Sequence, residues 1–75
     1  MAKLPRISGK DMVRFLEQQG FSVIRTRSSH HFMERKGKQT TVPVHGNRPL
    51  KIGTLRGILR DIGMSPEEFE QQLNA

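Results

Sequence analysis

The 75-residue sequence contains no cysteine, so it can form neither a disulfide nor a thiolate zinc site. Tryptophan and tyrosine are also absent, and the four phenylalanines mostly occupy core-type positions, so no aromatic ladder for stacking single-stranded bases is predicted. No run approaches the ~18 apolar residues that a membrane span needs. The first six residues lack the apolar run of a signal peptide, so we expect a cytoplasmic protein.

Acidic residues are scarce. Seven Asp and Glu stand against 13 Lys and Arg, which gives a formal net charge of +6. Such a surplus favours a polyanionic partner: RNA, DNA, an anionic membrane or an acidic protein. The carboxylates are scattered, and no pair is placed to hold Mg²⁺ for a two-metal nuclease. No glycine-rich phosphate loop or dinucleotide fingerprint is present, so we expect no cofactor.

The apolar pattern changes period along the chain and predicts six elements. They are a helix over residues 9–19, strands over residues 21–27, 30–35 and 39–44, a helix over residues 53–62, and a short helix after Ser65. Ser8 and Ser65 are expected to cap helices, the latter in a capping box with Glu68. Gly20 and Gly63 are expected to end helices in left-handed turns.

This order, α-β-β-β-α with a short extra helix, predicts an α+β domain of two layers. The strands should form a three-stranded antiparallel meander whose one face is covered by helices. The other sheet face, or its edge, would be left to water or to a partner. Pro43 has no N–H and must lie at an edge or close its strand. We expect one domain over residues 1–75, with a flexible basic arm over residues 1–7.

Three histidines, His30, His31 and His45, are the side chains best suited to accept a proton at neutral pH. RNA can be cleaved without metal when a general base takes the 2′-OH proton and cations stabilise the phosphate charge. DNA lacks that hydroxyl. A purely structural role for these histidines is the alternative. Their spacing matches no standard zinc pattern, so no metal site is predicted.

His30 and His31 are adjacent in a predicted strand, so they point to opposite faces. Phe32 shares a face with His30, and Met33 shares one with His31. Alternation alone therefore leaves open which histidine meets a substrate. His45 is expected to be a loop residue.

Basic side chains are expected in turns around the sheet and on its first strand. They are Lys36, Lys38, Arg48 and Lys51 in turns, and Arg25 and Arg27 on the strand. Some of them are candidates for contacts to nucleic-acid phosphates. The alternative is that they are solvated charges that keep the protein soluble.

Three blocks of sequence, at residues 28–32 (SSHHF), 41–45 (TVPVH) and 51–64 (KIGTLRGILRDIGM), resemble successive blocks of HicA-type toxins, also called the YcfA family. The resemblance covers about residues 9–73. It implies a double-stranded-RNA-binding-domain-like fold, an mRNA interferase activity that halts translation, and a HicB antitoxin that masks the active site. Since the chain is basic, we expect that antitoxin to be acidic, and we expect the free toxin to be a monomer.

The family's catalytic histidine follows a Gly-Ser or Gly-Gly pair and maps onto His30, with His31 as the runner-up. The family usually has glycine where this chain has Ser28. The leading hypothesis is a metal-independent endoribonuclease. The alternatives are a double-stranded-RNA-binding module without chemistry and, more weakly, a DNA-binding subunit of a regulatory complex.

Overall fold

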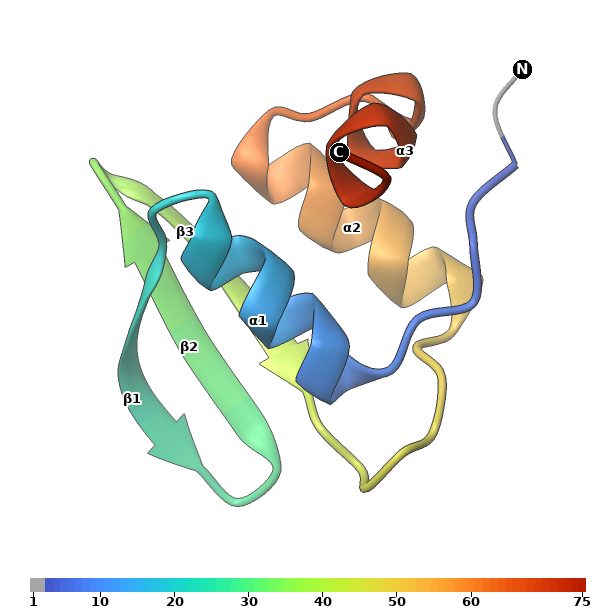
Figure 1. Ribbon diagram of the computed structural model, residues 1–75. Helices are drawn as coiled ribbons and strands as arrows, with labels where there is room; N and C mark the ends of the chain where they lie inside the picture. Colours follow the sequence, from blue (N-terminus) through green and yellow to red (C-terminus); the bar gives the residue numbers. More distant parts are fainter. Residues whose placement is uncertain (1–2) are drawn as a thin grey trace.

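A computed structural model describes residues 3–75 and shows a helix, three strands and two further helices in chain order (Figure 1). The elements are α1 (Gly9–Gln18), β1 (Ser22–Arg27), β2 (His30–Arg35), β3 (Lys38–Pro43), α2 (Ile52–Ile62) and α3 (Pro66–Leu73). The strands form one antiparallel sheet in the order β1-β2-β3. The predicted α+β fold with a three-stranded antiparallel sheet is confirmed.

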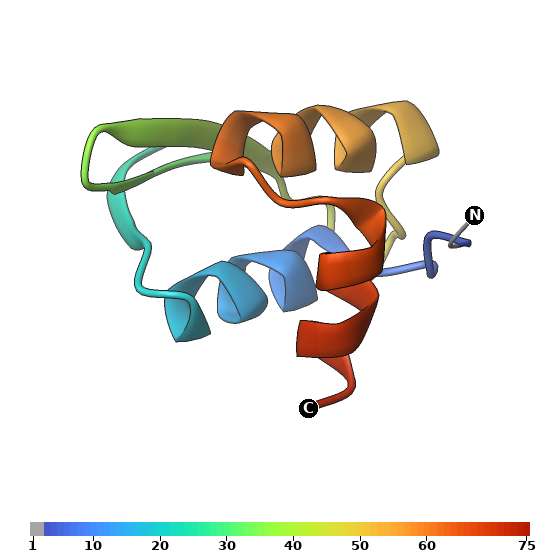
Figure 2. The same ribbon diagram turned by 90° about the horizontal axis from the view of Figure 1, so that it is seen from above.

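The elements lie in two layers, but α2 is placed differently from the expectation. Seen from above, the sheet and α2 lie side by side in one layer, and α1 and α3 form the other (Figure 2). Two hydrogen bonds tie β3 to α2. The Thr40 hydroxyl donates to Asp61 Oδ2 at 3.0 Å, and Lys38 Nζ donates to the Ile62 carbonyl at 3.3 Å. Only α1 therefore covers the sheet, and the opposite sheet face is open.

The hydrophobic core lies on the α1 side of the sheet. Its fully buried side chains come from every helix and from β2 and β3: Met12, Leu16, Met33, Val42, Leu55, Leu59 and Phe69. Phe15 and Phe69 meet edge to face with ring centroids 4.9 Å apart, a favourable aromatic geometry. No helix within residues 3–75 is long and apolar enough to cross a membrane.

The predicted helix ends are confirmed. Ser8 Oγ accepts a hydrogen bond from the Asp11 amide at 3.1 Å. Ser65 and Glu68 form the capping box, with both hydrogen bonds at 3.1 Å. Gly20 and Gly63 have φ values of 97° and 73°, as left-handed helix ends require. These signals depend only on neighbouring residues, which is why the sequence could reveal them.

The segment before α1 is packed on the body of the protein. Leu4 packs against the core, Ile7 is buried, and the Ile7 carbonyl accepts a hydrogen bond from the Leu50 amide at 2.7 Å. Leu4 and Ile7, which belong to the expected flexible arm, thus contact the body of the protein. Residues 1 and 2, which the same expectation included, lie outside the described residues.

Candidate nucleic-acid interface

A β-bulge in β1 turns two arginines onto the open face of the sheet. Along β1, the Cα partners are Val23 with Met33, Arg25 with Phe32, and Arg27 with His30. Ile24 has no partner and is the extra residue of the bulge. Because side chains alternate along a strand, the bulge moves Arg25 and Arg27 from the α1 side to the open side. They thereby share a face with His30.

The two adjacent histidines lie in different environments. His30 is exposed, at the start of β2 on the open face. His31 is partly buried beside α1, in a small hollow lined by Lys10, Val13 and Glu17, and its Nδ1 is buried without a hydrogen-bond partner. Only His30 is thus available to a large substrate on the open face. In the described part of the chain, no group of three or more His, Asp or Glu side chains could hold a metal ion.

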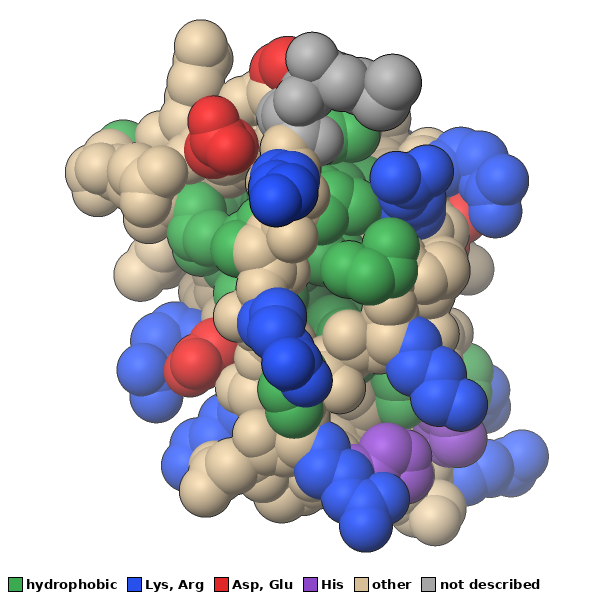
Figure 3. Space-filling view, turned by 90° about the vertical axis from the view of Figure 1, so that its right-hand side faces the viewer, with side chains coloured by type: hydrophobic (Ala, Val, Ile, Leu, Met, Phe, Trp, Pro, Cys, Tyr) green, Lys and Arg blue, Asp and Glu red, His purple; other side chains and the backbone are tan. Residues whose placement is uncertain are grey.

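The loop after β3 begins beside the turn that precedes His30. The Val44 amide donates to the Ser29 carbonyl at 2.7 Å, so the chain leaves the sheet next to this turn. His45 follows directly and is exposed. In the space-filling view, two histidines and several Lys and Arg side chains gather at the lower end of the molecule, and the visible acidic side chains lie higher (Figure 3).

A hollow of about 280 Å³ lies between the end of β3 and the start of α2. Its polar lining comes from His45, Arg48, Lys51 and Thr54. The first turn of α2 has no acidic residue, and Lys51 at the N-cap provides no side-chain cap. The amide groups at this helix start therefore add partial positive charge to that of Arg48 and Lys51. The hollow is suited to hold an anion such as a phosphate.

The structure does not bring Lys36 and Lys38 close to His30 or to this hollow. Both follow β2, whereas His30 begins it, and a strand of this length spans about 17 Å. The ammonium group of Lys38 donates to the last carbonyl of α2, at Ile62. Arg25, Arg27, Arg48 and Lys51 are thus the predicted cations that share the open face with His30 or lie near its end of the sheet.

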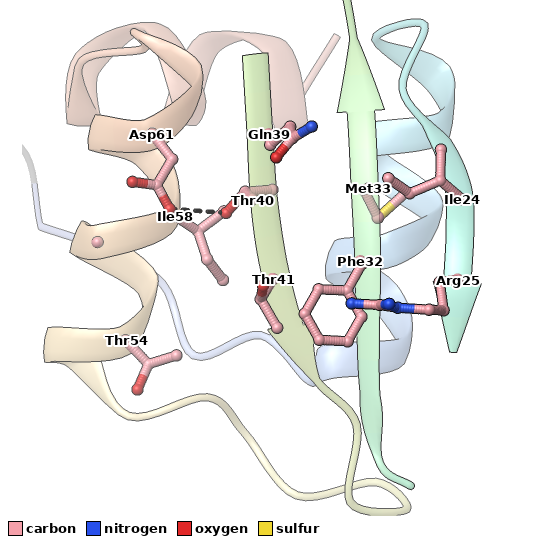
Figure 4. A pocket seen from close by; sticks show the side chains of 11 residues that line it. Ile24, Arg25, Phe32, Met33, Gln39, Thr40, Thr41, Thr54, Ile58 and Asp61 are labelled. Carbon is pink, nitrogen blue, oxygen red and sulfur yellow. Dashed lines mark hydrogen bonds between the residues drawn. The ribbon is translucent and has the colours of Figure 1, made fainter. Parts of the chain in front are cut away.

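A groove of about 700 Å³ crosses the open face where the sheet meets α2 (Figure 4). Its lining includes Ile24, Arg25, Phe32, Thr41, Ile58 and Asp61. The guanidinium carbon of Arg25 lies 4.7 Å from the centroid of the Phe32 ring, within cation–π range. Phe32 is only partly buried, whereas the three other phenylalanines are in the core.

Sequence reasoning did not identify Phe32 as a candidate for base stacking. The strand alternation in the sequence could have indicated it, because Phe32 is two residues from His30 in a strand and so shares its face. Arg25 could not be placed beside it, because the bulge at Ile24 reverses the alternation of β1.

A family model described as the HicA toxin of bacterial toxin–antitoxin systems matches residues 9–64. The matched range starts at the first residue of α1 and ends two residues after α2, so it contains the whole sheet and all the side chains of the open face described above. No curated protein matches the chain. Because the family model matches most of the sequence, the chain belongs to the HicA toxin family of bacterial toxin–antitoxin systems.

Proposed function

We propose that this HicA-family toxin is an endoribonuclease that cuts mRNA without a metal ion and uses His30 as its general base. The observation that carries the proposal is the exposed imidazole of His30 on the open face of the sheet, in register with Arg27. Neither imidazole nitrogen of His30 is engaged by another described residue, so the ring is available to a substrate.

The proposed reaction needs only groups that this face offers. The His30 imidazole takes the proton of a ribose 2′-OH, and the 2′-oxygen attacks the adjacent phosphorus. The bond from phosphorus to the 5′-oxygen breaks, and that oxygen takes up a proton from solvent. The products are a 2′,3′-cyclic phosphate and a 5′-hydroxyl. The cation of Arg27 would stabilise the added negative charge of the phosphorane transition state.

The remaining cations are proposed to hold the RNA backbone. Arg25 lies on the open face, while Arg48 and Lys51 line the hollow at the start of α2. Lys36 and Lys38 are at the far end of the sheet and would contact only the more distant phosphates of a longer RNA. Such contacts bind any RNA sequence and weaken as salt concentration rises.

Membership of a toxin–antitoxin family gives the protein an antitoxin partner. We propose a HicB-type protein with an acidic surface, since the toxin carries a net charge of +6. By covering the open face, such a partner would exclude mRNA from His30. The toxin would act in the cytoplasm, where mRNA is translated.

The test compares two histidine variants on the same RNA in the presence of EDTA. His30→Ala should lower the cleavage rate by roughly 10²- to 10⁴-fold, the usual contribution of a general base. His31→Leu removes the neighbouring imidazole but fills its space, and it should cleave like the wild type. Thermal melting of both variants verifies that they fold.

The product ends check the chemistry, because a 2′,3′-cyclic phosphate requires attack by the 2′-OH. An RNA with a single 2′-deoxy nucleotide at the cleavage site should stay intact. Full activity of folded His30→Ala would remove this residue from the mechanism. Tight binding with all RNA recovered intact would instead identify a binding module without chemistry.

A further inference from the structure

We propose that Arg25 and Phe32 together form a stacking platform for an unpaired RNA base next to the cleaved phosphate. The inference rests on the proposed function and adds to it the form of the substrate, which must be single-stranded at the cleavage site. The two side chains come from neighbouring strands and meet on the open face, with the Arg25 guanidinium 4.7 Å from the ring centroid (Figure 4).

The position of the platform fits a nucleotide held at His30. Phe32 is two residues along β2 from His30 and on the same face, a separation of roughly 7 Å. A phosphate beside His30 would therefore place its nucleotide's base within reach of the platform. Of the four phenylalanines only Phe32 is outside the buried core, so no other phenylalanine is available to stack a base.

The groove around the platform has room for a base, and its walls include apolar side chains that suit the aromatic face of the base. Its volume is about 700 Å³, and Ile24 and Ile58 provide apolar walls. Planar guanidinium and phenyl groups both stack on nucleobases, whatever the base. A base inside a duplex is already stacked on its neighbours and cannot lie flat on a sheet, which excludes duplex RNA from this site.

The charge of the open face favours RNA over an apolar segment of another protein. Arg27 stands two residues from Arg25 on the face that carries the platform and in register with His30, so a backbone phosphate next to the stacked base would meet its cation. An apolar protein segment would bury the Arg25 guanidinium without an anion to pair with it, which is costly.

The experiment uses a short single-stranded RNA that carries the fluorescent base 2-aminopurine beside a 2′-deoxy nucleotide, so that binding is measured without cleavage. Stacking should quench the fluorescence when the wild-type protein binds. Phe32→Leu should abolish the quenching and weaken binding by about 5- to 150-fold, the range for losing one stacked base. Phe32→Trp keeps a flat ring and should restore both.

Two arginine substitutions separate stacking from charge. Arg25→Lys keeps the charge but loses the planar group, so it should reduce the quenching. Arg56→Lys makes the same change at an exposed residue of α2 that lines no described cavity, and the quenching should persist. Val23→Ala, on the opposite face of β1, is the matching control for an apolar side chain.

The platform is refuted if folded Phe32→Leu binds single-stranded RNA as tightly as the wild type, or if a duplex of the same sequence binds equally well and is weakened equally. It is also refuted if Phe32→Leu weakens binding to the antitoxin but not to RNA, in which case Arg25 and Phe32 form a contact to a protein. Binding is measured on an RNA that cannot be cleaved. A wild-type protein that quenches the fluorescence of this RNA but leaves the corresponding all-ribose RNA intact would therefore refute the proposed nuclease activity and would still support the platform.

Discussion

Ser28 stands where the backbone favours glycine. Its φ is 55°, while Ser29, the other residue of this two-residue turn, has no positive φ. These signs match a type II′ hairpin turn, whose first central position prefers glycine. A positive φ raises the conformational energy of a residue other than glycine by roughly 1 kcal/mol or more, which lowers the stability of the fold. The strain is located two residues before His30.

Ser28→Gly should therefore raise the free energy of unfolding, by roughly 0.5–1 kcal/mol after the greater chain entropy of glycine is subtracted. Urea denaturation measures the change. Ser29→Gly, one residue later, gains nothing from a positive φ and should lower stability instead. Equal effects of the two substitutions would show that the turn is not strained at Ser28.

His30 and His31 show which part of a site alternation can predict. The strand pattern places them on opposite faces, and the structure agrees. Which face is open depends on where α1 packs, and that is decided by Met12, Phe15 and Leu16, which are 14 to 18 residues away from His30 in the sequence. No local pattern carries this information.

Gly9 allows α1 to approach the end of β3. A Cβ atom built on Gly9 would lie 2.1 Å from the Pro43 carbonyl oxygen, a backbone atom that cannot turn aside. Gly53, in the first turn of α2, has nothing within 4 Å of the same built atom. Gly9 is buried and has no room for a side chain, whereas Gly53 is exposed and has room for one, so the pair contrasts two glycines in the first turns of their helices.

Gly9→Ala should destabilise the protein by about 2 kcal/mol or more, because α1 must move away from the sheet. Gly53→Ala should stabilise it by up to about 1 kcal/mol through helix propensity. Both values follow from denaturant titration, with circular dichroism to verify the fold. A stabilising Gly9→Ala would mean that α1 packs less closely on β3 than described.

The helices and strands themselves follow from local signals, since caps, glycines and hydrophobic period identified all six elements to within a few residues. Two arrangements did not follow. The bulge at Ile24 is one unpaired residue, and the sequence shows only that the apolar alternation is irregular there. The place of α2 alongside β3 involves contacts between residues far apart in the chain, such as the hydrogen bond between Thr40 and Asp61, which are 21 residues apart.

Basic side chains lie at both ends of the sheet. Arg48 and Lys51 lie at the start of α2, near the end of the sheet that carries His30, while Lys36 is at the opposite hairpin. Each phosphate contact to single-stranded nucleic acid adds about 0.7 to the slope of log K against log salt. For the proposed RNA complex, the salt dependence of binding would report where the RNA strand runs on the protein.

Replacing both Arg48 and Lys51 by alanine should lower that slope by about 1.4, the amount for two phosphate contacts. Lys36→Ala should lower it less, because Lys36 lies far from the open-face site. Fluorescence anisotropy at several salt concentrations gives the slopes. If Lys36→Ala lowered the slope by about 0.7, as each residue of the double variant is expected to do, RNA would be held by charge spread over the whole protein.

The core and the proposed chemistry face opposite ways across one sheet. Arg25 and Arg27 lie on the open face, while the fully buried side chains of the sheet, Met33 and Val42, face the helical side. Substitutions at sites without shared neighbours act independently on stability. Substitutions on the open face should therefore change what the sheet binds and leave the free energy of unfolding nearly unchanged.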